Sequence, residues 1–255
     1  MSHGFIVAID GTAGSGKSTT ARLAAQELGF LHLDTGAMYR AITLKVIRQK
    51  LDLNNTALLE KLLESTQLDL RPEPSESTAK DAKNAKWSSV GSAGRGARVI
   101  LDGEDVSEAI RTPEVDKSVS QVSVIPQVRQ LLVAEQRRIA EGRRVVCEGR
   151  DITSVVFPHA DLKFYVDASL AARAERRKLE LTHKGMAVSV KSIEDNLTER
   201  DYIDSTRAHS PLTRVKDAIY LDTSNLTVDE EVMIVVNLTR MRIGRDEGRG
   251  ARGGA

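Results

Sequence analysis

The feature that most constrains this chain is a glycine-rich segment near its amino end, Gly11-Thr-Ala-Gly-Ser-Gly-Lys-Ser18. It matches the pattern G-x-x-x-x-G-K-[S/T] and directly follows the apolar run at 5–9. Short, β-branched, unalternating runs are typical of strands buried on both faces of a parallel sheet. Residues 17–28 then carry alanine and leucine at helical spacing, and Gly29 is a typical helix-ending residue. The segment therefore predicts a strand, a tight loop and a helix in succession.

Four more short apolar runs lie at 30–33, 145–147, 162–166 and 218–221, with helical segments between them. Together the five runs predict an α/β fold with a five-stranded parallel sheet and helices on both faces.

Local signals predict further elements. Residues 98–101 predict another strand, which ends in a tight turn at Asp102-Gly103. Thr227 and Glu230 match a capping box and predict a helix from there to about Arg240.

Two segments differ in composition from the rest. Residues 71–97 are rich in Ser, Ala, Lys and Gly and predict a polar, mobile surface insertion, in which Trp87 either docks on the domain or lies exposed. Residues 244–255 are rich in Gly and Arg and predict a disordered tail.

Composition excludes several classes of protein. The 37 Lys+Arg and 36 Asp+Glu leave a net charge of +1, so bulk charge does not attract nucleic acid or an anionic membrane. Aromatic residues make up only 4%, which argues against base-stacking platforms. One cysteine, Cys147, lies mid-strand and is expected in the core, which fits a reducing compartment. No apolar run approaches the ~18 residues that span a bilayer. We expect a cytoplasmic monomer that binds neither nucleic acid nor membrane.

The glycine-rich segment also predicts chemistry. Glycines let consecutive backbone N–H groups turn inward around phosphates, at the positive end of a helix. Lys17 would neutralise the β- and γ-phosphates of a nucleoside triphosphate, and the Ser18 hydroxyl would ligate Mg²⁺ together with water and the nucleotide. The predicted ATP-binding residues are Gly11, Thr12, Ala13, Gly14, Ser15, Gly16, Lys17, Ser18 and Thr19.

The rest of the chain narrows the class of nucleotide-binding protein. The motifs N-K-x-D and D-x-x-G of Ras-type GTPases are absent, as is the signature of transporter ATPases. A small-molecule kinase is then favoured, and such an enzyme needs arginines for its acceptor. Arginines occur in four segments, at 34–40, 148–151, 173–177 and 200–207.

These segments carry a resemblance to a known family. The chain resembles bacterial cytidylate kinases, of the nucleoside monophosphate kinase group of P-loop kinases. Besides the glycine-rich loop, the resemblance rests on the order and spacing of Leu33–Arg40, Gly103–Ser107, Ile110–Thr112, Ser120–Val122, Glu148–Asp151, Val155–Pro158, Arg200-Asp201, Asp204-Ser205, Arg207 and Pro211-Leu212.

The resemblance implies a single kinase domain over 1–243 that transfers a phosphoryl group from Mg-ATP to CMP or dCMP. It implies an acceptor-binding insert at about 38–112 and a lid at about 173–186. Two alternatives stay open: a kinase for another small acceptor, and a non-catalytic protein that uses ATP as a switch.

The resemblance also implies roles for individual residues. The acceptor phosphate would be met by Thr35, Arg40 and Arg150, and the cytosine edge by Ser120, Arg129 and Asp151. Arg200 and Asp204 would contact the ribose and phosphate, and Arg207 would close over the phosphoryl group with the lid residues Arg173, Arg176 and Arg177. The implied catalytic residues are Lys17, Arg150, Arg176, Arg177 and Arg207.

Several residues allow two interpretations. Glu148 could act on Mg²⁺ through water or simply fix the phosphate loop. Asp151 could orient Arg150 through a salt bridge, accept from the base amino group, or both. Family members often carry Gly-Thr after Gly-Arg-Asp, but this chain has Ile152-Thr153-Ser154, which puts the local backbone in doubt. Asp10 is expected to tether the phosphate loop.

Other polar groups predict no site. The arginine cluster at 137, 138, 143 and 144 is expected to be a solvated helix end. The histidines show no metal-ligand spacing.

Overall fold

The five expected strands lie side by side and are all parallel in the computed structural model, which describes residues 4–71, 97–183 and 185–250. The order across the sheet is β2-β6-β1-β7-β8, so the first strand of the chain lies in the centre. Each strand begins and ends within two residues of the expected run. The strands are β1 (Phe5–Gly11), β2 (Leu31–Asp34), β6 (Arg144–Gly149), β7 (Leu162–Asp167) and β8 (Ile219–Asp222).

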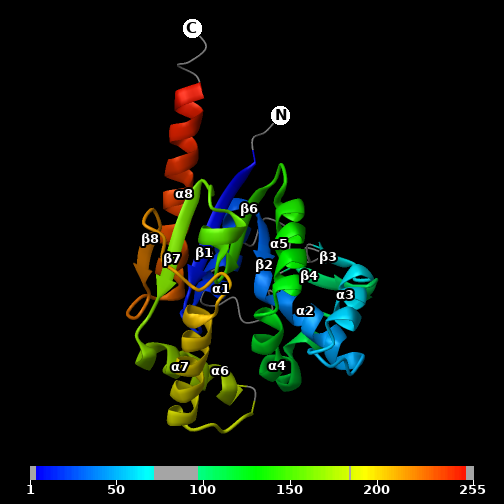
Figure 1. The fold of residues 1–255 in the computed structure, drawn as a ribbon. Coiled ribbons are helices and arrows are strands. Elements are labelled where there is room, and N and C mark those ends of the chain that lie inside the picture. Colours follow the sequence, from blue (N-terminus) through cyan, green and yellow to red (C-terminus); the bar gives the residue numbers. More distant parts are fainter. Residues whose placement is uncertain (1–3, 72–96, 184, 251–255) are drawn as a thin grey trace.

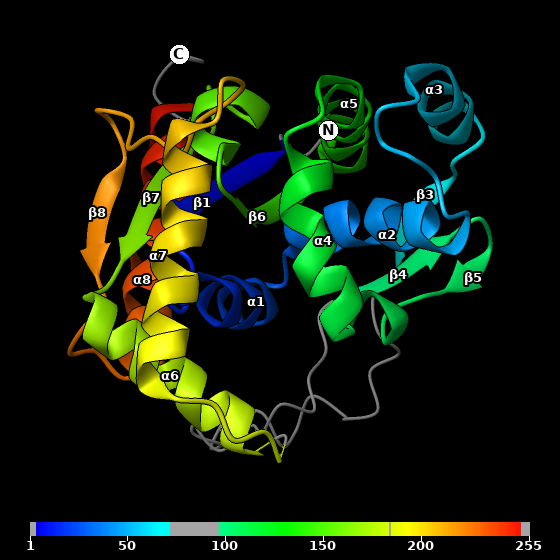
Figure 2. The same cartoon turned by 60° about the horizontal axis from the view of Figure 1, so that its bottom comes forward.

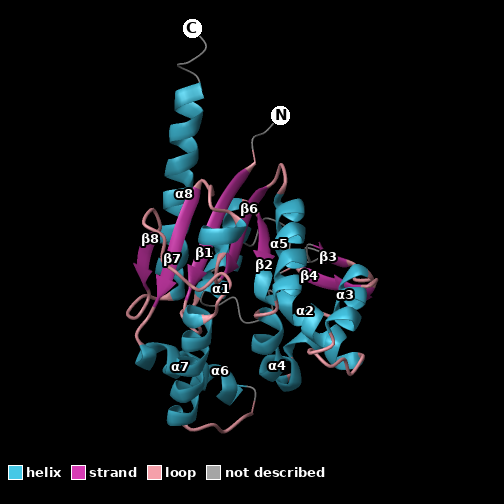
Figure 3. Ribbon diagram, viewed as in Figure 1, coloured by secondary structure: helices cyan, strands magenta, loops and turns pink. Residues whose placement is uncertain are grey.

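Helices cover both faces of this sheet, as expected (Figure 1, Figure 3). The helices of the described residues are α1 (Lys17–Leu28), α2 (Thr35–Arg48), α3 (Thr56–Glu64), α4 (Pro113–Ser123), α5 (Pro126–Ala140), α6 (Leu170–His183), α7 (Val190–Thr206) and α8 (Val228–Gly250). Short helical turns lie at η2 (Ala109–Arg111, 3-10) and η3 (Ile152–Val156, π).

Side chains of β1 alternate between two hydrophobic cores. Val7 and Ile9 pack with α1 and α8 on one face, and Ala8 packs with α2 and α5 on the other. All three are fully buried, which explains why the run shows no polar alternation. Cys147 is in the second core and is fully buried, as expected.

Two helix termini match their sequence signals. The helix α1 ends at Leu28, and Gly29 adopts the left-handed conformation that stops it. At the start of α8, Glu230 accepts from the Thr227 backbone N–H at 2.8 Å, and the Thr227 hydroxyl faces the Glu230 N–H at 3.3 Å. The capping box is therefore confirmed.

The far end of α8 differs from the prediction. The helix continues to Gly250 rather than ending near Arg240, so residues 244–250 are helical and not a disordered tail. Glycine lowers helix propensity but keeps its N–H donor, and the Arg, Asp and Glu around it favour or tolerate a helix. Residues 251–255 lie outside the described part.

A smaller antiparallel sheet lies beside the main sheet (Figure 1). It consists of β3 (Leu68–Arg71), β4 (Arg98–Leu101) and β5 (Glu104–Asp105). Asp102 and Gly103 have φ of 51° and 88° and form the tight turn between β4 and β5, as expected. This sheet falls within the expected insert at 38–112. The expected loop at 71–97, Trp87 included, lies almost wholly outside the described residues.

Figure 2 looks onto the edge where the parallel strands end. Helix α1 starts between α6 and α7 on one side and α2 and α4 on the other. Helices α6 and α7 pack on each other through Ala174, Ile193 and Leu197, which also contact Ala13 of the glycine-rich loop. Among the described helices, none combines the length and apolar character that a membrane crossing requires.

Candidate active site

The carboxyl ends of three neighbouring strands bring the predicted residues to one edge of the sheet. In register, Asp10 of β1 pairs with Gly149 of β6, and Asp34 of β2 pairs with Glu148. The loop after β1, the Arg150 turn after β6 and the start of α2 after β2 are therefore neighbours. Ligands of open α/β sheets bind at such an edge.

The glycine-rich loop wraps around the amino end of α1. A Cβ on Gly11 would lie 2.0 Å from the Val166 carbonyl oxygen of β7, so only glycine fits there. The Lys17 ammonium crosses the loop and donates to the Thr12 carbonyl at 3.1 Å. Burial, followed by the charge of Arg150, lowers the pKa of Lys17 to about 7. A phosphate placed beside this lysine would favour its charged form.

Ser18 and Glu148 place a hydroxyl and a carboxylate side by side next to the loop. The Ser18 hydroxyl donates to Glu148 Oε2 at 2.5 Å, and His32 Nε2 lies 3.2 Å from Oε1. Burial raises the pKa of Glu148, but His32, Lys17 and Ser18 together lower it below its ordinary value. Carboxylate and hydroxyl oxygens suit Mg²⁺. The described residues hold no cluster of three or more acidic, His or Cys groups, so phosphate oxygens and water would supply the other ligands.

Three arginines meet on the other side of Lys17. Arg40 of α2 pairs with Asp116 of α4 at 2.8 Å, and Arg150 Nε donates to Asp204 Oδ2 at 2.6 Å. Burial, Arg150 and then Arg40 lower the pKa of Arg200. Among the described residues, the Arg200 side chain makes no hydrogen bond or ion pair, although the charges of Asp204 and Asp116 act to raise its pKa. The three guanidinium groups therefore form a positive cluster that these two carboxylates only partly neutralise.

A second polar cluster surrounds Asp151, which is almost fully buried. Its carboxylate pairs closely with Arg129 of α5 and lies 3.8 Å from Arg207. Arg129 in turn lies over the Tyr39 ring, at 5.7 Å from its centroid. The prediction that Asp151 orients Arg150 is wrong, because Arg150 pairs with Asp204 instead.

The other residues predicted to bind the acceptor also lie at this edge of the sheet or on the helices beside it. Thr35 is buried, and its hydroxyl donates to the Glu148 carbonyl at 2.8 Å. Ser120 is half-buried on α4. Arg207 NH1 lies 3.9 Å from Asp204 Oδ1, so Asp204 faces both Arg150 and Arg207.

Asp10 does not tether the phosphate loop, contrary to expectation. Its carboxylate accepts from the N–H groups of Ile152 and Thr153, at 2.8 Å each, and from the Thr153 hydroxyl at 2.6 Å. Both carboxylate oxygens of Asp10 are thus used by the turn after β6, and none of these bonds goes to the loop. Ile152 is fully buried and packs in the core with α5 and Cys147.

Two of the three arginines of the predicted lid contact the glycine-rich loop. Arg173 donates to the Ala13 carbonyl at 3.1 Å and pairs with Asp201, which accepts from the Ala13 N–H at 3.1 Å. Arg176 donates to the Ser15 carbonyl at 3.2 Å. Arg177 instead pairs with Glu180 on its own helix, with 34% of its side chain exposed.

Three residues in this network were missed from the sequence as parts of the site. Asp201 binds both Ala13 and Arg173, and Thr223 and Glu231 bind Arg176 from behind the loop. Asp201 is among the residues on which the resemblance rests, but the sequence predicted no role for it. Thr223 and Glu231 lie in no motif, and nothing local marks them out.

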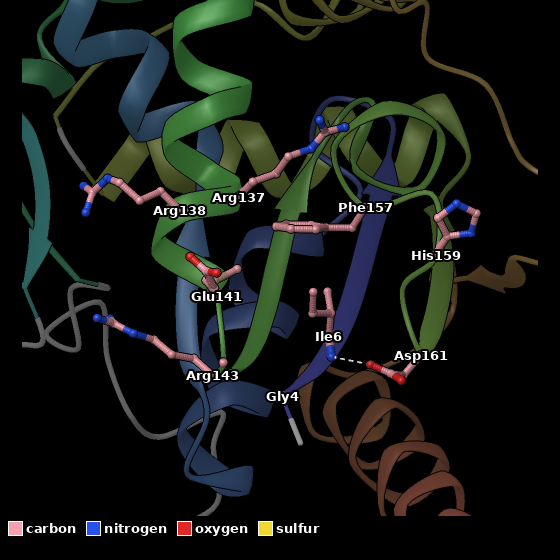
Figure 4. Close-up of a pocket in the computed structure, with 11 residues that line it drawn as sticks. Gly4, Ile6, Arg137, Arg138, Glu141, Arg143, Phe157, His159 and Asp161 are labelled. Carbon is pink, nitrogen blue, oxygen red and sulfur yellow. Dashed lines mark hydrogen bonds between the residues drawn. The ribbon is translucent and has the colours of Figure 1, made fainter. Parts of the chain in front are cut away.

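The arginine cluster at 137, 138, 143 and 144 lies at the opposite edge of the sheet, and all four residues are exposed, as expected. Figure 4 shows an open cleft there, of about 640 Å³, between the end of α5 and the starts of β1 and β7. Arg137 donates to the Val155 and Val156 carbonyls, and Arg138 pairs with Glu135. These arginines serve local contacts.

Comparison with known proteins adds an independent finding. A family model described as cytidylate kinase matches residues 7–241. A cytidylate kinase of Caldanaerobacter subterraneus subsp. tengcongensis is 44% identical over 234 residues, which cover 92% of this chain and 94% of that protein. One of Pelotomaculum thermopropionicum is 45% identical over 241 residues, with 94% and 97% covered. One of Chlorobaculum tepidum is 44% identical over 236 residues, with 91% and 92% covered.

Proposed function

The chain belongs to the cytidylate kinase family, and we propose that its glycine-rich loop holds Mg-ATP while the arginines opposite hold the acceptor. The enzyme transfers a phosphoryl group from ATP to CMP or dCMP and yields ADP with CDP or dCDP. The acceptor phosphate is already ionised near neutral pH, so the reaction needs positioning and charge neutralisation rather than a general base.

The observation that carries this proposal is a group of four positive side chains, Lys17, Arg40, Arg150 and Arg200, among which only two ion pairs with carboxylates are formed, to Asp116 and Asp204. Arg150 and Arg200 both lower the pKa of Lys17, and Arg150 and Arg40 lower that of Arg200. Such a group suits two anionic groups that must approach each other. A protein that only binds ATP would have no use for the last three.

On the donor side, Lys17 neutralises the β- and γ-phosphates. Mg²⁺ would be held by the Ser18 hydroxyl together with the nucleotide and water. The metal would supply charge neutralisation on the phosphates. Glu148 supports this role because its ionised carboxylate lies within 2.5 Å of the Ser18 hydroxyl, where it can orient that hydroxyl and accept from a metal-bound water.

On the acceptor side, Arg40 and Arg150 take the CMP phosphate, together with Thr35 once its hydroxyl turns from the Glu148 carbonyl. Arg200 and Asp204 contact the ribose and phosphate. The cytosine edge is read by Ser120, Arg129 and Asp151. As an acceptor, the Asp151 carboxylate favours the 4-amino group of cytosine over the carbonyl of uracil.

Three parts of the chain would divide these tasks. The kinase domain spans 1–243, the acceptor-binding insert about 38–112, and the lid about 173–186. The contacts of Arg173 and Arg176 with the loop support a lid that closes over the donor and excludes water. Arg207, beside Asp204, supports the phosphoryl group from the acceptor side. The geometry gives Arg177 no comparable support.

The test is an assay of purified protein with Mg-ATP and each of AMP, GMP, UMP, CMP and dCMP. We expect CMP and dCMP to react well ahead of UMP. Comparable turnover of UMP would overturn the proposed role of Asp151 in selecting cytosine. Preference for another acceptor would overturn the proposed binding of CMP by the arginines. The proposal includes a cytoplasmic location, which the single buried cysteine supports, and a monomer, which sedimentation would test.

A further inference from the structure

Glu231 on α8 is a buried acid that belongs to none of the motifs above. It is 1% exposed. Its Oε2 accepts from the Thr20 hydroxyl of α1 at 2.5 Å, and its Oε1 lies 3.2 Å from Arg176 NH2 of α6. A carboxylate this deep needs such partners, because burial alone raises the pKa of Glu231. Glu231 thus joins the C-terminal helix to the loop helix and to the lid.

Through Arg176, Glu231 acts on one peptide of the glycine-rich loop. Arg176 NH1 donates to the Ser15 carbonyl at 3.2 Å, while NH2 donates to the Thr223 carbonyl at 2.5 Å. The Thr223 hydroxyl lies 2.8 Å from the same Ser15 oxygen. The Ser15 carbonyl is therefore held from behind by two donors.

Holding that carbonyl fixes the next N–H group. In a trans peptide the C=O and the following N–H point in opposite directions. The peptide between Ser15 and Gly16 is trans, so its N–H is turned away from Arg176 and Thr223, toward the inside of the loop. Gly16 has φ of 91°, and a Cβ there would lie 2.9 Å from Glu231 Oε2. The acid and the glycine are packed directly against each other.

We propose that Glu231 is a positioning residue for the phosphoryl donor: it holds Arg176, which holds the Ser15 carbonyl, which aims the Gly16 N–H at the ATP phosphates. The inference rests on the proposed role of the loop as the ATP site. It assigns the far helix α8 a part in donor binding and none in acceptor binding, because the proposed acceptor arginines lie on α2, α5, α7 and the turn after β6.

The test is Glu231→Gln, which keeps the shape and removes the charge that fixes Arg176. Glu230→Gln is the matched control, because Glu230 is exposed and touches only the cap of α8. We expect E231Q to raise KM for ATP by about tenfold and to leave KM for CMP within about twofold, with E230Q unchanged in both. An unchanged KM for ATP, or an equal rise in both KM values, would overturn the proposal.

Thr223→Val provides a second test should E231Q fold poorly in a thermal unfolding scan. It removes the other donor to Ser15 and one contact of Arg176, while the Thr223 carbonyl and Glu231 still hold Arg176. We expect KM for ATP to rise and KM for CMP to stay constant, whereas an unchanged KM for ATP would contradict the mechanism.

A binding measurement that requires no catalysis distinguishes failure of this inference from failure of the proposed function. In a ¹H–¹⁵N spectrum, ADP should shift the Gly16 amide strongly in the wild type and E230Q and less in E231Q. Equal shifts in all three would refute the positioning role. A wild type that shifts Gly16 but forms no product would overturn the proposed reaction instead.

Discussion

The proposed donor loop and acceptor cluster would both hold phosphate, but with different chemical groups. The loop is one continuous segment, 11–19, whose backbone N–H groups and single lysine would face the ligand. The acceptor cluster takes its arginines from separate elements, and three of them are already matched with a carboxylate: Arg40 with Asp116, Arg150 with Asp204, and Arg129 with Asp151.

This difference sets what each site does when a ligand arrives. We expect the donor site to rearrange less than the acceptor site when a ligand binds, because its donors would mostly be backbone N–H groups of one loop. Exceptions include the Ala13 N–H, which donates to Asp201, and Lys17, which donates to Thr12. The acceptor arginines must share or exchange their carboxylates for phosphate, so part of the interaction energy is lost in the exchange. We therefore expect loop substitutions to reduce the rate of transfer and acceptor substitutions to weaken CMP binding first.

The largest effect is expected for Lys17→Ala. It removes the one side-chain charge on the donor side, which has no substitute within the loop, and should reduce kcat by about 10³-fold or more. Steady-state assays at saturating ATP and CMP would measure it, with thermal unfolding to confirm the fold. A kcat within tenfold of wild type would show that the backbone groups of the loop suffice for phosphoryl transfer. It would contradict the proposed role of Lys17.

Arg150→Ala should act mainly on the acceptor. We expect kcat/KM for CMP to fall by about 10²-fold and KM for ATP to change by less than about threefold. Arg138→Ala is the matched control, because Arg138 is an exposed arginine at the opposite edge of the sheet. Should KM for ATP rise as much as KM for CMP, Arg150 would serve both nucleotides and the two sites would not be separable.

Asp151→Asn tests the base-reading part of the cluster. The amide removes the charge that Arg129 and Arg207 share, and its NH₂ can donate to the uracil carbonyl. The ratio of kcat/KM for CMP over UMP should drop by about 30-fold. An unchanged ratio would assign the discrimination to Ser120 or Arg129.

The same residue predicts a pH dependence. Burial raises the pKa of Asp151, and Arg129 and Arg207 oppose that rise without cancelling it. The carboxylate is then charged above the raised pKa and loses its acceptor role as pH falls through it. We expect kcat/KM for CMP to decline on the acid side in the wild type more than in D151N. The titration of CMP itself is common to both proteins, so identical profiles would contradict this prediction.

The same contrast explains what the sequence could predict. The donor loop, α1 and its ending at Gly29 follow from adjacent residues, because turns, caps and short buried strands are encoded locally. The acceptor residues are separated by up to 169 positions, from Thr35 to Asp204. The arginine content of their segments suggested an acceptor site, but only the resemblance assigns roles to the individual residues.

The misses have the same physical origin. The partners of Asp10, Arg150 and Glu231 depend on which elements the fold brings together, and no local pattern specifies them. The length of α8 was missed for a different reason: glycines near its end lower helix propensity without forbidding the helix.

The smallest effect is expected for Arg177→Ala. This variant tests whether the lid already has its active arrangement around the donor in this structure. Its pair with Glu180 is on one helix and exposed, so its loss should change kcat and both KM values by less than about threefold. Lys178→Ala, one residue along α6, is the control for loss of a lid charge. A fall of 100-fold or more in kcat for R177A alone would mean that α6 turns Arg177 onto the phosphoryl group when both substrates are bound. The donor site would then also depend on a rearrangement when substrates bind, as we expect of the acceptor site. The difference between the two sites would hold only for the glycine-rich loop.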